Sequence, residues 1–358
     1  MKKLWFLIIT FIIGLTALSQ QVELDKFSFS ANFRSLPREP QDPSYKTYTV
    51  FLKCGPLMRS LNNPTELAGR INISGWRFIP IDAHLRVSIY MEDVTIESQE
   101  NNTKIQILKD NAGKDIGKKI TSQTEVFYTY SARILITDFK GNLIREDTIV
   151  TRQKKNSYLC PITNSEAEAN AYIRFGNLKL LNELNLLAFT QLAQSLSEDL
   201  TYSYGYPERT INDILLVINS ENHPAYEGFK QAWINVSLSM MNMSANEPID
   251  SVRSKLQPTI DYFTQIKNSY VSGDKANRKI RYACNYNLSK IYYYLDEPEL
   301  ASQEASELII NKYGAKDGKI LEAMANDLKL KMNQSKMNTR HFHIDVENYK
   351  GPEVVSRN

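Results

Sequence analysis

The spacing of apolar residues changes once along this chain of 358 residues, and no other feature constrains the fold as much. Before about residue 151, apolar and polar residues tend to alternate, which is the two-residue period of a β-strand. From about residue 166, apolar residues recur three and four positions apart, which is typical of an amphipathic α-helix. The sequence therefore predicts an α+β protein of two domains, with an antiparallel β-sandwich-like domain at residues 20–151 and an α-helical domain at residues 166–335.

The β half is predicted to consist of short strands separated by turn residues. In the run 84–97, Leu85, Val87, Ile89 and Met91 alternate with polar residues, and the alternation slips at Glu92–Asp93, where we expect a bulge. Glycines and charges predict a long hairpin loop over residues 110–119 and a turn at 138–142. Further strands are expected at residues 45–54, 103–109, 124–138 and 143–151.

The helical half is predicted to follow a polar linker at residues 152–165, with Ser165 placed to cap the first helix. A short apolar segment at residues 211–218 interrupts the helical pattern, and the breaker pair Gly351–Pro352 lies in an expected loose tail at residues 336–358. The helices are expected at residues 166–198, 224–241, 248–270, 276–295, 298–313 and 317–332.

The N-terminus has the three parts of a secretory signal peptide. Lys2 and Lys3 precede an apolar run over residues 4–18, and small residues flank Leu18 at the expected cleavage site. A membrane anchor is the alternative, but the run is shorter than the 17 or so residues that usually span a bilayer. We therefore expect residues 1–19 to be removed, no further integral membrane span, and an exported protein of the periplasm, the cell surface or the extracellular space.

The charge balance argues against a nucleic-acid partner. The chain has 43 Lys and Arg against 40 Asp and Glu, and removal of the signal peptide takes two of the lysines. A nearly neutral protein lacks the clustered surplus of basic residues on which binding to nucleic acid normally depends.

The three cysteines, Cys54, Cys160 and Cys284, show neither a CxxC pair nor the spacing of a zinc site. Three separate thiols are the favoured interpretation. A Cys54–Cys160 disulfide remains open as the alternative, because an oxidising compartment permits one bridge.

Residues 287–308 resemble one tetratricopeptide repeat. Leu288, Ser289 and Tyr292 stand at the first-helix positions of the motif, and Ala301 stands at the small position of the second helix. The family's first-helix Trp position holds Asn285. The resemblance implies a divergent, tetratricopeptide-like (TPR-like) array of helical hairpins whose inner groove binds another protein.

If the resemblance holds, Tyr286, Lys290 and Tyr293 form the groove face. Their spacing of four and then three places them on one side of a helix by itself. Tyrosine suits a recognition surface because it combines a large apolar area with a polar tip. Tyrosines that simply support helix packing are the alternative.

We tested three constellations for chemistry. The first, His341, His343 and Asp345, has the ligand types that zinc prefers, but lies in the predicted tail without a fourth ligand. The lone His84 is more typical of a structural role. The third is the set of carboxylates Glu92, Asp93 and Glu97. A glycosidase needs a carboxylate pair across a cleft, but a solvated strand face explains these residues equally well. We predict no catalytic site, no metal and no cofactor.

The sequence as a whole resembles two-part secreted envelope proteins of Gram-negative bacteria. We expect a non-catalytic scaffold that binds another envelope protein through its helical domain during assembly. A carbohydrate-binding module is the first alternative, with exposed tyrosines and Trp76 stacking on a glycan. A glycoside-type hydrolase built on Glu92 or Asp93 is the second.

Overall fold

A computed structural model describes residues 22–175 and 177–353, so the predicted signal peptide at residues 1–19 lies outside the described residues. The chain divides into two compact units. Unit 1 contains the chain up to Pro40 together with Tyr206–Ile344, and unit 2 contains Gln41–Gly205 together with the chain from Asp345. The structure is thus α+β, as predicted, but its division differs from a single boundary at residues 152–165.

The pairing of two distant strands accounts for this difference. Strand β1 (Leu24–Arg34) pairs antiparallel with β10 (Glu208–Ile218) over its whole length, from Leu24 opposite Ile218 to Arg34 opposite Glu208. The segment 211–218, which looked like an interruption of the helical half, is therefore the main part of a strand. Because the chain leaves unit 1 after β1 and returns to it at β10, unit 2 is an insertion between the two strands.

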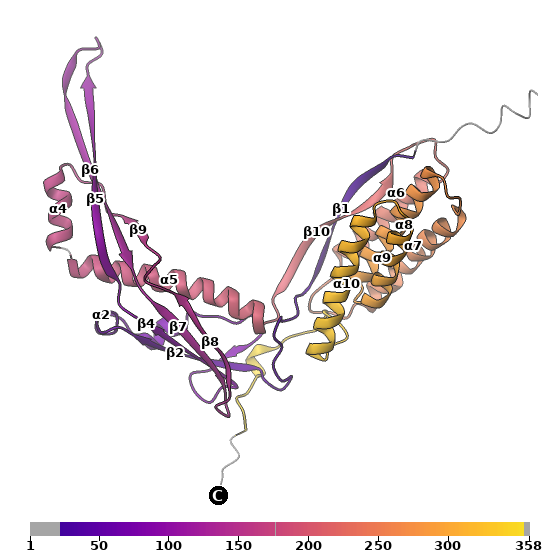
Figure 1. Ribbon diagram of the computed structural model, residues 1–358, viewed down its shortest axis with the longest axis horizontal. Helices are drawn as coiled ribbons and strands as arrows, with labels where there is room; N and C mark the ends of the chain where they lie inside the picture. The colour runs from indigo at the N-terminus through magenta and orange to yellow at the C-terminus, as the bar shows by residue number, and fades with distance from the viewer. Residues whose placement is uncertain (1–21, 176, 354–358) are drawn as a thin grey trace, which may run out of the picture. The chain divides into compact units, whose positions relative to one another are not determined.

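The helices of unit 1 lie close to where the apolar periodicity predicts them. Contacts join α6 and α8 to the β1–β10 pair, and α9 packs against both α8 and α10. Asp274 caps α8 by accepting a hydrogen bond from Asn277 N at 3.0 Å. The helices, coloured from pink to yellow in Figure 1, are α6 (Tyr226–Met241), α7 (Asp250–Ser269), α8 (Lys275–Tyr294), α9 (Pro298–Ile310) and α10 (Ala315–Ser335).

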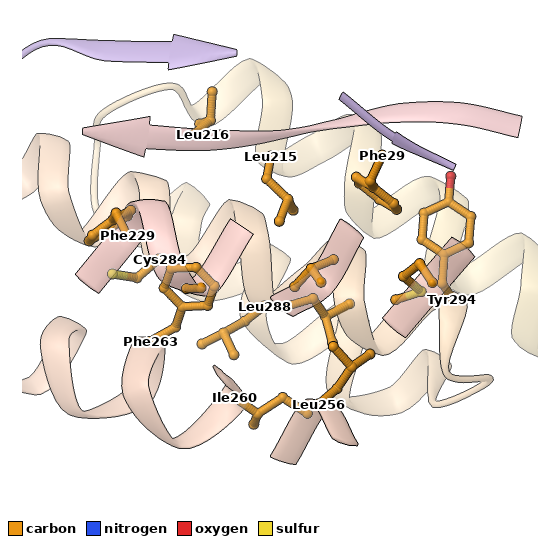
Figure 2. Packing of buried hydrophobic residues seen from close by; sticks show 14 of the residues in the cluster. Phe29, Leu215, Leu216, Phe229, Leu256, Ile260, Phe263, Cys284, Leu288 and Tyr294 are labelled. Carbon is orange, nitrogen blue, oxygen red and sulfur yellow. The ribbon is translucent and has the colours of Figure 1, made fainter. Parts of the chain in front are cut away.

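The core of unit 1 lies between the strand pair and the helices (Figure 2). Phe29 of β1 contacts the ring of Tyr294 edge-on, with 5.5 Å between ring centroids. Leu215 of β10 points toward Leu288 of α8, and both side chains are fully buried. The strand pair is therefore one wall of the helical core.

Unit 2 contains a five-stranded sheet in the order β3-β2-β4-β7-β8. Strand β2 runs parallel to both β3 and β4, so the prediction of an antiparallel arrangement is wrong for β2. A parallel pair needs a crossover connection, which here contains the short helices α2 (Pro56–Leu61) and α3 (Pro64–Ala68). The strands are β2 (Thr47–Cys54), β3 (Arg77–Phe78), β4 (Leu85–Met91), β7 (Ala132–Asp138) and β8 (Leu143–Val150).

One face of this sheet is apolar and buried, while polar and aromatic residues alternate on the other. Two polar contacts tie helix α5 (Asn177–Tyr204) to this part of unit 2: Asn185 accepts a hydrogen bond from Val94 N, between β4 and β5, at 3.0 Å, and Asp199 pairs with Arg145 of β8 at 2.6 Å. The buried strand residues include Val50, Leu52, Val87, Ile89, Ile134 and Ile136.

A three-stranded sheet, β5-β6-β9, completes the strands of unit 2. Its members are β5 (Thr95–Lys109), β6 (Asp115–Thr129) and β9 (Asn156–Leu159). The bulge predicted at Glu92–Asp93 is wrong, because β4 ends at Met91 and the register shift lies between Ile96 and Ser98. The expected long loop at residues 110–119 is shorter, since β6 already begins at Asp115.

Helices α4 (Glu166–Phe175) and α5 correspond to the predicted helix at residues 166–198 but belong to unit 2. Ser165 caps α4, as predicted, by accepting a hydrogen bond from Glu168 N at 3.2 Å. Residues 152–165, expected as a linker, include β9, which pairs with β6.

We expect the Leu215→Ala substitution to lower the free energy of unfolding by about 2–5 kcal/mol, because it empties a fully buried position in the wall of the core. Ile211→Ala in the same strand is the matched control. Its side chain is 39% exposed, and the loss should be well below that of Leu215→Ala. Urea unfolding measures both, and equal losses would contradict the core position assigned to β10.

Candidate interaction surface

The predicted groove face on α8 lies against β10 of the same chain. Lys290 is only 7% exposed, and its Nζ donates a hydrogen bond to Asp213 Oδ2 of β10 at 2.7 Å. The same Nζ lies 5.7 Å from the centroid of the Tyr286 ring. The structure thus brings Tyr286 and Lys290 together, as their spacing predicts, and Lys290 is bonded to β10 of the same unit.

Two further side chains of α8 fasten β10. Tyr294 donates a hydrogen bond to Asp213 Oδ2 at 2.7 Å, so this carboxylate accepts from two groups. Asn287 accepts from Leu216 N and donates to Leu216 O, both at 2.8 Å, which replaces the backbone partners of a neighbouring strand. Burial, reinforced by the Asp213 charge, raises the pKa of Tyr286 to about 12, so its hydroxyl stays protonated.

Tyr293 is in contact with Arg340, in the segment that follows α10. The guanidinium of Arg340 lies 4.8 Å from the Tyr293 ring centroid and donates to Tyr293 O at 2.6 Å. Arg340 also pairs with Asp296 at 2.5 Å, and both side chains are almost fully buried. The segment around Arg340 is therefore anchored within unit 1, so the prediction of a loose tail at residues 336–358 is wrong for this part of it.

His341 is buried beside this ion pair. Its Nδ1 lies 2.8 Å from Ser244 O, its Nε2 lies 3.8 Å from Asp296 Oδ2, and burial lowers its pKa. His343 and Asp345, the other residues of the possible metal set, are exposed, and Asp345 accepts a hydrogen bond from Asn348. Over the described residues, no group of three or more His, Cys, Asp or Glu side chains is arranged to hold a metal ion.

The strand carboxylates have structural partners. Glu92 pairs with Arg152 at 2.9 Å, and hydrogen bonds from Ser131 and then Arg152 lower its pKa. Asp93 accepts from the backbone N–H groups of Leu57 and Met58, both at 2.9 Å, at the start of α2.

A cavity of about 490 Å³ lies next to these two carboxylates, at the ends of β2 and β4. Cys54 lines it, and burial raises the pKa of its thiol, which keeps it protonated at neutral pH.

The third carboxylate, Glu97, accepts a hydrogen bond from Thr129 Oγ1 at 2.8 Å.

The remaining sequence candidates also have local structural roles. Trp76 is 6% exposed and donates from Nε1 to Tyr204 O at 2.8 Å, so its ring is not presented to solvent. His84 Nδ1 lies 2.8 Å from Thr47 Oγ1, and its ring stacks on Tyr45. The cysteines Cys54, Cys160 and Cys284 are unpaired thiols, as favoured from the sequence.

The far half of the β5–β6 hairpin presents an apolar face that the sequence reasoning missed. Ile105 lies opposite Ile120 in the register, and Ile107 follows on the same face by the two-residue alternation. Ile116 lies beside them, at the register shift near the turn. Their exposed fractions are 62% for Ile105, 50% for Ile107, 64% for Ile116 and 43% for Ile120. We call these residues the isoleucine face; the alternation of Ile105 with Ile107 was its only signal in the sequence.

Basic residues lie on both faces of the far half of the hairpin, on and behind the isoleucine face. Lys118 lies on the face itself, opposite Ile107, and the turn is held by Asp110, which accepts from the N–H groups of Ala112 and Lys114. The far half carries more Lys than Asp: Lys104, Lys109, Lys114, Lys118 and Lys119 against Asp110 and Asp115. The hairpin extends away from the rest of unit 2 (Figure 1).

No family model matches the chain, and no curated protein matches it. A solved structure of a minor lipoprotein from Acinetobacter baumannii is similar at 14% sequence identity, over 46% of this chain and 96% of that chain, with a TM-score of 0.19. At this TM-score the likeness carries no argument about fold or function. Within the part of the chain that the structure describes, no helix has both the length and the apolar character needed to cross a bilayer.

We expect Lys290→Ala to lower the free energy of unfolding by about 3 kcal/mol, because it leaves the Asp213 carboxylate without its buried cation. Lys329→Ala is the control, since the Lys329–Glu299 pair is exposed and should contribute less than about 1 kcal/mol. Chemical unfolding compares the two variants. A loss at Lys290 no larger than at Lys329 would argue that the α8 face is not fastened to β10.

We expect His341→Gln to reduce the loss of stability between pH 7 and pH 5. The pKa of His341 is lowered in the folded state, so the stability it supports is present above about pH 6.5 and is lost as the pH falls below that value. Burial also lowers the pKa values of His84 and His223, so the contribution of His341 is read as the difference between variant and wild type. His343→Gln, at an exposed position, should keep the wild-type slope in urea unfolding; an unchanged slope in His341→Gln would refute the assignment.

Proposed function

We propose that this chain is an exported, non-catalytic protein of the Gram-negative cell envelope that binds another envelope protein during assembly of a larger complex. The export signal in the sequence supports the location. The isoleucine face of the β5–β6 hairpin carries the proposal of protein binding, because it is an apolar surface with no partner in the described part of the chain.

The physical argument rests on the cost of this surface in water. A two-stranded ribbon with solvent on both faces is marginally stable. Its β propensity could be met by threonine as well as isoleucine, so strand formation alone does not require a group of apolar side chains on one exposed face. A partner that covers Ile105, Ile107, Ile116 and Ile120 would remove their apolar area from water. Each Å² of apolar area removed stabilises the complex by about 25 cal/mol. The lysines of the hairpin favour a partner with acidic residues at the rim of its own apolar patch.

The structure moves the proposed binding surface away from the groove expected on the tetratricopeptide resemblance. Lys290 is bonded to Asp213 of β10 and Tyr293 lies against Arg340, so a partner at these two residues would have to displace parts of the same chain. The helical domain is better understood as the support on which the strand pair is fastened, and the hairpin of unit 2 as the surface that binds.

The two alternative functions have less support. A glycan-stacking role for Trp76 would require exposure of a ring that is buried and hydrogen-bonded. Acid–base catalysis by Asp93 would require release of the two backbone N–H groups that it caps. The contact of Trp76 therefore argues against glycan recognition at that residue, and the contacts of Asp93 argue against hydrolysis at that residue.

The proposal is tested by placing a photo-crosslinking amino acid at position 107 and, as a matched control, at position 106 of the full chain in its native envelope. Ile107 lies on the isoleucine face and Gln106 on the opposite face of the same strand. We expect a discrete protein adduct from position 107, at least fivefold stronger than from position 106. Ile105→Thr with Ile120→Thr should abolish it while keeping β propensity.

An adduct of equal strength from both positions, or no protein adduct from position 107, would overturn the proposal. Circular dichroism of the Ile105→Thr, Ile120→Thr variant establishes whether the remainder of the protein is folded. Retention of the adduct in that folded variant would also refute the assignment of the isoleucine face.

A further inference from the structure

Unit 1 contains a polar cleft that is separate from the surface proposed for protein binding. Its walls are the end of α7, the loop that follows it, the first half of α8 and the end of α9, and its volume is about 610 Å³. The polar and charged residues that matter here are Lys267, Arg278, Arg281, Asn285, Glu307 and Lys312.

Two of the cations in this cleft already have partners that hold its walls in place. Lys267 Nζ donates to Glu304 and Glu307 at 2.7 and 2.8 Å, and its side chain is 11% exposed. Arg281 donates to the backbone carbonyl oxygens of Tyr270 and Ser272, which closes the end of α7 onto α8. These contacts join α7, α8 and α9 around a preformed site.

Two buried polar groups of the cleft are left without hydrogen-bond partners. Arg278 Nε is buried and has no hydrogen-bond acceptor, and none of the described carboxylates forms an ion pair with Arg278 or with Lys312. Asn285 is 3% exposed, lines the cleft, and its Oδ1 has no donor. Buried polar groups are normally satisfied, so a donor and an acceptor left open in one cleft point to a ligand.

We propose that this cleft binds a small oxyanion, a carboxylate or a phosphate, that carries a hydrogen-bond donor next to the charge. Arg278 donates to the anionic oxygen, because a guanidinium has donors only and forms its strongest hydrogen bonds to charged acceptors. Lys312 adds a second positive charge at the cleft. Asn285 Oδ1 accepts from the neighbouring donor of the ligand.

The cleft lies in unit 1 and contains none of the residues of the isoleucine face. Refuting one of the two proposals would therefore leave the other unaffected. It also does not include Tyr286, Lys290 or Tyr293.

The test is a titration of the full-length protein with glycolate, acetate and inorganic phosphate at constant ionic strength, followed by NMR at the Nε–H group of Arg278 and the side-chain amide of Asn285. We expect saturable shifts at both groups. Saturation by glycolate alone identifies a carboxylate ligand, saturation by phosphate alone a phosphate ligand, and saturation by both the shared oxyanion chemistry.

Arg278→Gln should weaken binding of the saturating probe about tenfold or more, as expected for loss of one charge-assisted hydrogen bond. Arg209→Gln, at an exposed position of β10, removes the same charge from unit 1 and should leave the affinity unchanged. Asn285→Leu should remove any preference for glycolate over acetate, because only glycolate carries a hydroxyl donor. If the glutamine variant does not fold, Arg278→Lys replaces it in the test. This variant keeps the positive charge and should still weaken binding, because it loses the guanidinium geometry.

Shifts that fail to saturate with all three probes would overturn the proposal. An equal loss of affinity in Arg209→Gln would do so as well, because it would show attraction to the general charge of unit 1 rather than to a site.

Discussion

The antiparallel pairing of β1 with β10 is the constraint on which the rest of unit 1 depends. The two strands come from positions about 180 residues apart, and their pairing requires unit 2 to be folded as an insertion between them. A two-stranded ribbon is marginal by itself, so it needs the apolar surface of α6 and α8 beneath it. The buried contacts of α8 with Asp213 and Leu216 then hold the ribbon in one position.

This arrangement explains why the α8 face is rich in tyrosine and contains a lysine. In the sequence, Tyr286 and Lys290 have the features of a recognition surface, and they do recognise an extended segment, which is β10 of the same chain. A buried lysine needs a carboxylate close by, and Asp213 supplies it at 2.7 Å. The isoleucine face of the β5–β6 hairpin has no such segment against it in the described part of the chain, which is why we propose partner binding there.

Local signals predicted much of the secondary structure. The cap at Ser165, the turn at residues 138–142 and the periodic apolar residues of α6 to α10 act through neighbours only a few positions away. The candidate sites were harder to predict, because the roles of Lys290, Asp93 and His341 depend on groups far away in the chain. The partner of Lys290 is 77 residues away, and His341 is buried against Ser244, 97 residues away.

The sequence alone determined the α+β class, the positions of most helices and the N-terminal pattern of an exported protein, since each follows from composition or from short-range periodicity. Only the tertiary structure decided which strands pair, where the chain divides, and which polar side chains are buried in ion pairs or left open in a cleft. The physical reason is that strand pairing and burial depend on contacts between distant segments. A period of two residues identifies a strand but does not specify its partner.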